Sequence, residues 1–166
     1  MTFGRPTLQA ALLAAALLST GSLTTFAQAD EVSSFVTNGT AIGGTDPVAY
    51  FTQGKPVQGS DEFTATYDDV TWKFSSSENR DLFIANPSKY APQFGGFCAF
   101  GVSKGYKVPI VPEAWSIVEG KLYLNNSLSV QERFQSNSEE LIDHARLNWE
   151  IVKDKRPEDI TSAIIR

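Results

Sequence analysis

The chain of 166 residues contains a single cysteine, Cys98, and a single histidine, His144. One cysteine excludes an intramolecular disulfide, and one thiol with one imidazole cannot supply the four ligands of a structural zinc site. A content of 42% apolar and 20% charged residues is that of an ordinary globular domain, so we expect one packed domain.

The first 29 residues have the order of a secretory signal peptide. Arg5 precedes an apolar run over residues 8–18, no acidic residue occurs, and an Ala-Gln-Ala cleavage site follows at residues 27–29. The apolar run is shorter than the about 20 residues that a membrane-spanning helix needs. We predict a Sec-type signal peptide over residues 1–29, a periplasmic or secreted location, and a mature protein that is not integral to the membrane.

The charge balance bears on the class of partner. The whole chain has 14 basic and 19 acidic side chains and a net charge of -5, and loss of residues 1–29 would remove only Arg5 from this balance. A protein that binds nucleic acid needs a basic surface for the phosphate backbone. The acidic balance therefore argues against a nucleic-acid partner.

Hydrophobic periodicity predicts two β-hairpins. Apolar residues alternate with polar ones over 63–67 and 70–74, on either side of an Asp-Asp pair, and again over 115–118 and 122–124 around a Glu-Gly turn. We also expect a short strand over 48–51. The acidic pairs of the chain are interpreted as turn and helix-start residues.

Helix start and stop signals follow each hairpin. We expect a helix that begins at a capping box of Ser75 and Glu78, ends at Asn86-Pro87, and is followed by a short helix toward Tyr90. Two more helices are expected after Ser129 and Ser136, and a short one near residues 160–165. The order of strands, helix, hairpin and helices predicts an α+β fold with a small, mostly antiparallel sheet.

Cys98 lies in the most unusual segment of the chain, residues 94–101, which contains three aromatic residues and three glycines. A free cysteine is either a small buried hydrophobic residue or a reactive thiol, and both interpretations stay open. His144 is expected inside a helix, either at its surface or as a ligand. Together these two residues would be the minimum for an activated thiolate or for a two-point soft-metal site.

Several segments resemble the YHS domain. The main ones are Asp-Pro-Val-Ala-Tyr-Phe (46–51), Trp-Lys-Phe followed by three serines and Glu-Asn-Arg (72–80), and Ala-Asn-Pro-Ser-Lys-Tyr-Ala-Pro (85–92). The resemblance covers about residues 40–150. The chain is similar to the exported bacterial branch of the family, some members of which are described as selenoproteins. The resemblance implies a YHS domain over 41–152 and a periplasmic location. The polar, glycine-containing residues before the domain predict a flexible arm over 30–40, and the residues after it, interrupted by Pro157, predict a tail over 153–166.

The resemblance also bears on metal binding. YHS modules of copper-pumping ATPases carry cysteines at motif positions that correspond here to Ala49, Ser75 and Asn79. None of the three is a thiol, so that metal site is not carried over. In the exported branch the candidate residue is instead the one at the position of Cys98. Some relatives have selenium at the equivalent position, which implies that the sulfur of Cys98 has a functional role.

Three hypotheses about function follow. The first is a non-enzymatic protein that binds a soft metal ion such as copper through Cys98, with His144 as a second ligand, because a thiolate favours Cu(I) over hard cations. The second is a thiol-dependent oxidoreductase in which Cys98 is the catalytic thiol and an external thiol partner resolves it. The third is an interaction module, for a partner or for a second copy in a homodimer, in which Cys98 is buried and inert.

Overall fold

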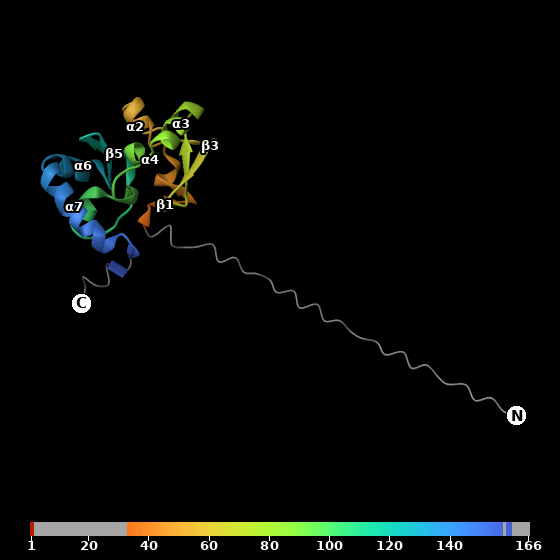
Figure 1. Cartoon of the computed structure of the whole chain (residues 1–166). Helices are drawn as coiled ribbons and strands as arrows, with labels where there is room; N and C mark the ends of the chain where they lie inside the picture. Colours follow the sequence, from red (N-terminus) through yellow and green to blue (C-terminus); the bar gives the residue numbers. More distant parts are fainter. Residues whose placement is uncertain (2–32, 158, 161–166) are drawn as a thin grey trace.

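A computed structural model describes Met1 and residues 33–157, 159 and 160 of the chain. The predicted signal peptide, beyond Met1, and the predicted helix near residues 160–165, beyond Ile160, lie outside the described residues. The described part contains six α-helices and two small sheets with mostly antiparallel strands (Figure 1). The prediction of an α+β fold is confirmed.

The first sheet has the strand order β1-β2-β4-β3. Its strands are β1 (Val36–Thr37), β2 (Thr40–Ala41), β3 (Ser60–Tyr67) and β4 (Val70–Phe74). The β3–β4 pair is antiparallel, which confirms the first predicted hairpin, and β2 joins β4 in parallel where Thr40 faces Thr71. Part of the predicted arm thus contributes to this sheet, because β1 and Thr40 lie within residues 30–40.

The second sheet is the predicted hairpin of β5 (Val111–Val118) and β6 (Lys121–Asn125). Successive side chains of β6 point to opposite faces, as the period of two in a strand requires. Leu122 and Leu124 enter one group of buried residues, whereas Tyr123 enters another. β6 therefore separates two hydrophobic cores.

The first core, here called the sheet core, lies under the four-stranded sheet and α3. Its buried members are Ala41, Ile42, Val48, Tyr50, Val70, Trp72, Phe74, Phe83, Tyr90, Leu122 and Leu124. The second, the helix core, lies under α5, α6 and α7. Its members are Phe94, Phe97, Ala99, Val102, Tyr123, Phe134, Leu141, Ile142 and Ala145. Figure 1 shows the corresponding halves, with β3 and α3 on one side and the blue helices α6 and α7 on the other.

The helices that precede Cys98 are short. They are α2 (Ala49–Thr52), α3 (Ser77–Ala85) and α4 (Pro87–Tyr90), with 3-10 turns η1 (Ile42–Gly44) and η2 (Phe94–Gly96). The predicted strand over 48–51 is wrong. The carboxylate of Asp46 accepts hydrogen bonds from the amides of Val48 and Ala49 (2.8 and 3.2 Å), which starts a helical turn there.

The predicted helix starts lie within a few residues of the observed ones, but the residues that cap the helices differ from the predicted caps. α3 is capped by Ser76 rather than Ser75. α6 (Leu128–Gln135) is capped by Ser127, and α7 (Ser138–Val152) begins after Asn137. The expected caps at Ser129 and Ser136 are therefore wrong by two and one residues, because runs of Ser and Asn offer several capping side chains in a row.

Candidate functional site

Cys98 is the N-cap residue of the short helix α5 (Ala99–Ser103) and is 1% exposed. Its sulfur accepts a hydrogen bond from the amide of Gly101 (3.4 Å) and donates one to Oδ1 of Asn125 (3.8 Å). Its own amide donates to the carbonyl of Val108. The thiol therefore takes a hydroxyl-like capping role at the start of a buried helix.

Burial determines the protonation of this thiol. The loss of solvation raises the pKa of Cys98, and the backbone amides of Gly101, Asn126 and Phe100 offset only part of this effect. A thiol with a raised pKa and almost no exposure is a poor nucleophile at neutral pH, since the thiolate is the reactive form. The environment is that of a structural cysteine.

Asn125, at the end of β6, completes the surroundings of Cys98. It is fully buried, and its Oδ1 also accepts from the amide of Phe100 (3.3 Å), which fixes the orientation of the side-chain amide. Among the described residues, its Nδ2 has no hydrogen-bond partner. Asn125 thus ties the second sheet to the start of α5.

His144 lies in a different environment. It is exposed on α7, beside Asn137, Glu139, Glu140 and Asp143, whereas the neighbouring Ala145 faces the helix core. The polar contacts of Cys98 are with Asn125 and the start of α5. The role of His144 as a second ligand to a metal at Cys98 stays a prediction.

The carboxylate of Asp46 is surrounded by Ala49, Ser75 and Asn79, the three positions that the predicted YHS resemblance aligns with metal-binding cysteines. It is completely buried, and its Oδ2 accepts from the amide and hydroxyl of Ser75 (2.8 and 2.6 Å) and from Nδ2 of Asn79 (2.7 Å). Its Oδ1 accepts from the amide of Ala49. Ala49, Ser75 and Asn79 are therefore neighbours around one carboxylate.

These groups do not fit a copper ion. The three motif positions around Asp46 offer no sulfur, and donors from the protein already occupy both oxygens of the carboxylate. In the described part of the chain, no group of three or more His, Cys, Asp and Glu side chains is arranged to hold a metal ion. Copper binding through Cys98 and His144 stays a prediction, and the described residues offer no preformed set of metal ligands that supports it.

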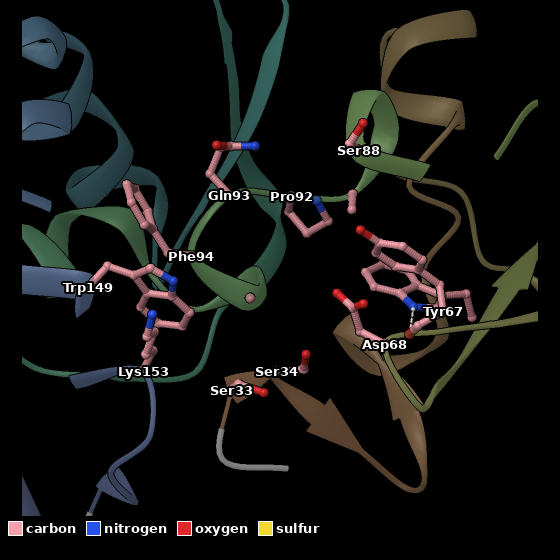
Figure 2. Close-up of a pocket in the computed structure, with 13 residues that line it drawn as sticks. Ser33, Ser34, Tyr67, Asp68, Ser88, Pro92, Gln93, Phe94, Trp149 and Lys153 are labelled. Carbon is pink, nitrogen blue, oxygen red and sulfur yellow. Dashed lines mark hydrogen bonds between the residues drawn. The ribbon is translucent and has the colours of Figure 1, made fainter. Parts of the chain in front are cut away.

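A groove of about 350 Å³ lies between the two cores (Figure 2). We call it the intercore groove. Tyr67 from the hairpin β3–β4 lies on one wall, and Phe94 and Trp149 from η2 and α7 lie on the other. Trp72, whose Nε1 donates to the carbonyl of Tyr67, also lines the groove. Pockets for small molecules have this size and are lined by aromatic side chains with a few polar groups.

The two walls differ in charge. Asp68, in the turn of the hairpin β3–β4, lies on the wall of Tyr67, and Lys153, the C-cap residue of α7, lies on the wall of Trp149 (Figure 2). Asp68 and the next residue, Asp69, both have positive φ values (49° and 58°), as a two-residue type I′ turn requires. The turn places the carboxylate of Asp68 at the groove.

Ser33 and Ser34 lie between the two walls (Figure 2), and Gly95 also lines the groove. The segment of the two serines is held by a hydrogen bond from the amide of Phe35 to the carbonyl of Gly95 (2.7 Å). Gly95 has a φ of 59°, and a Cβ at this position would lie 1.9 Å from the carbonyl oxygen of Ser33. Only glycine fits both the backbone conformation and this close approach.

Sequence reasoning missed the intercore groove. The segment over residues 94–101 is unusual in the sequence because of Cys98, whereas its contribution to the groove comes from Phe94 and Gly95. The Asp68-Asp69 pair predicts only a turn, which the structure confirms, and Lys153 lies in the predicted tail. The spacing of these residues along the chain carries no signal that the fold brings them together.

Comparisons with models of protein families, with curated proteins and with solved structures found no match. Among the helices of the described residues, none combines the length and the apolar character that crossing a membrane requires.

Proposed function

We propose that this protein is a non-enzymatic binding module that holds a small organic ligand in the intercore groove. The observation that carries the proposal is the pairing of aromatic side chains from two separate cores across one cavity of about 350 Å³. Tyr67 and Trp149 are only partly buried, so their rings offer apolar surface to a ligand.

In this proposal Cys98 is a structural residue. Its burial, its raised pKa and its capping contact with Gly101 support the hypothesis of an inert thiol. The same features give the thiol-redox hypothesis less support, because a reactive thiol needs access to solvent and a lowered pKa. No step of the proposed function involves bond making or breaking.

We also propose that the domain is of the YHS type and is exported. The convergence of Ala49, Ser75 and Asn79 on Asp46 supports the resemblance, since residues that share one metal in a related branch must be neighbours in the fold. In this chain the same place is a hydrogen-bonded carboxylate. The binding role of the family would then have moved to another part of the domain.

The test uses small probes of four charge types: phenylpropionate, phenethylamine, alanylphenylalanine and methyl glucoside. Each is titrated into the 15N-labelled protein at up to millimolar concentration. We expect at least one probe to shift the backbone amide signals of Gln93, Gly95 and Lys153, which line the groove. Shifts that are absent for all four probes, or that map elsewhere, would overturn the proposal.

Tryptophan fluorescence provides a matched control. Trp72 and Trp149 line the groove, whereas Trp115 packs against Tyr50 in the sheet core. Trp149→Phe should therefore remove much of the fluorescence response to a bound probe, and Trp115→Phe should preserve it. Equal responses from the two variants would place the binding site outside the groove.

A further inference from the structure

We propose that the ligand of the intercore groove is a short zwitterionic peptide, which binds with its ammonium group at Asp68 and its carboxylate at Lys153. This inference rests on the proposed function, because it names the ligand class of the same site. It starts from the opposite charges of the two walls, which Figure 2 shows on either side of the groove.

Asp68 is suited to an incoming ammonium group. Within the described residues its carboxylate makes no side-chain hydrogen bond or ion pair, so its oxygens are free to accept one. The ring of Tyr67 lies beside it on the same wall, and the charge of Asp68 contributes to the raised pKa of that phenol after burial. A carboxylate next to an aromatic ring attracts a cation through both its charge and the face of the ring.

Lys153 is suited to a carboxylate. Its ammonium group pairs with Glu150 (2.7 Å), and this contact uses one of three N–H donors. The backbone carbonyl of Lys153 accepts a hydrogen bond from Nζ of Lys107 (3.1 Å), which fixes this residue at the end of α7. The remaining donors of Lys153 can bind a carboxylate of the ligand.

The groups between the two charges suit a peptide. The aromatic rings of Phe94 and Trp149 can contact an apolar side chain, and the hydroxyl of Ser34 and the amide of Gln93 can form hydrogen bonds with a peptide group. The size of the groove limits the ligand to a few residues. A ligand with one charge only would leave the opposite charge of the groove without a partner, which costs affinity when a ligand displaces water from it.

The experiment compares three forms of one ligand by isothermal titration: alanylphenylalanine, its N-acetyl form and its C-terminal amide. We expect each blocked form to bind about tenfold more weakly, since a charge-assisted hydrogen bond contributes about 1.5 kcal/mol. Equal affinity for all three forms would overturn the inference. Preferential binding of phenylpropionate, phenethylamine or methyl glucoside would overturn it too, while leaving the proposed function in place.

Matched variants test which residue binds the ammonium group of the ligand and which binds its carboxylate. Asp68→Asn should abolish the difference between the free and N-acetyl forms, whereas Asp69→Asn, in the same turn and outside the groove, should retain it. Lys153→Gln should abolish the difference between the free and amidated forms, and Lys155→Gln should retain it. If both members of either pair behave alike, the assigned contact is wrong. If no probe of any class binds the wild-type protein, the proposed function fails together with this inference.

Discussion

The thiol of Cys98 and the side-chain amide of Asn125 form a buried pair, with Sγ donating to Oδ1 across 3.8 Å. The pair joins the start of α5 to the end of β6, so it connects the helix core with the second sheet. The sulfur also accepts the amide hydrogen of Gly101. One side chain thus caps a helix N-terminus and donates a hydrogen bond to the oxygen of a buried amide.

Replacement of Cys98 should separate its polar role from its volume. Cys98→Ser retains a group that caps α5 and contacts Asn125, so we expect a loss of about 1 kcal/mol or less in the free energy of unfolding. Cys98→Ala removes both contacts and should cost about 2 kcal/mol, because the amide of Gly101 loses its acceptor and Asn125 loses one of the two donors to its Oδ1. Urea unfolding followed by tryptophan fluorescence measures both values. Equal losses would show that the sulfur acts through its volume alone.

The raised pKa of Cys98 predicts a loss of stability in alkali. Below the ordinary thiol pKa of about 8.5, both the folded and unfolded chains keep the proton and the contribution to stability is complete. Above it, the unfolded chain ionises first, because burial disfavours the thiolate in the folded protein. The wild-type protein should therefore lose more stability than Cys98→Ser between about pH 8 and about pH 10. Parallel stability curves for the two proteins would contradict this.

Asp46 is predicted to be the most sensitive carboxylate to neutral replacement. Asp46→Asn exchanges one acceptor oxygen for a donor, which then faces the amides of Val48 and Ala49 or the donors of Ser75 and Asn79. We expect a loss of about 3 kcal/mol, since buried polar groups are left without partners.

Asp61→Asn is the matched control for Asp46. It breaks the ion pair with Lys73, in which the Asp61 side chain is 89% exposed, and should cost less than about 1 kcal/mol. Thermal unfolding of both variants at neutral pH distinguishes the two sites. A similar loss for both would show that the hydrogen bonds of Asp46 do not act as a unit.

The sequence predicts the secondary structure well where one local signal acts alone. Alternation in 63–67 and 70–74 predicts the β3–β4 hairpin, because each strand has one buried face. Local signals fail where a distant residue intervenes. The segment around Tyr50 has the composition of a strand, but the carboxylate of Asp46 binds the amides of Val48 and Ala49 at the start of a helical turn. Asp46 is itself held by Ser75 and Asn79, from 29 and 33 residues away.

The candidate site is formed almost entirely by residues that are far apart in the sequence. Tyr67 and Trp149 lie on opposite walls of one groove, yet they belong to a hairpin and a helix that are 82 positions apart. Each residue is also explained by its local role, as a strand residue or as a member of an amphipathic helix. Cys98, by contrast, is conspicuous in the sequence because of its rarity, and rarity gives no information on burial.

Gly95 links the backbone conformation to the shape of the intercore groove. Gly95→Ala places a methyl group 1.9 Å from the carbonyl oxygen of Ser33, and this backbone atom must move because no flexible side chain can yield. We expect the segment of Ser33 and Ser34 to shift away from η2, with loss of the hydrogen bond between Phe35 and Gly95. The groove should then lose affinity for its probes.

Gly105→Ala is the control that isolates this clash. Gly105 also has a positive φ (87°), but an added Cβ would meet no heavy atom within 4 Å. Both substitutions carry the cost of a left-handed residue, about 1–2 kcal/mol, so any further loss in Gly95→Ala comes from the contact with Ser33. Unfolding curves and the amide signals of Ser34 and Gln93 provide the readouts. If both variants bind the probes as the wild-type protein does, the serine segment is not part of the binding site, because its displacement would leave the ligand contacts unchanged.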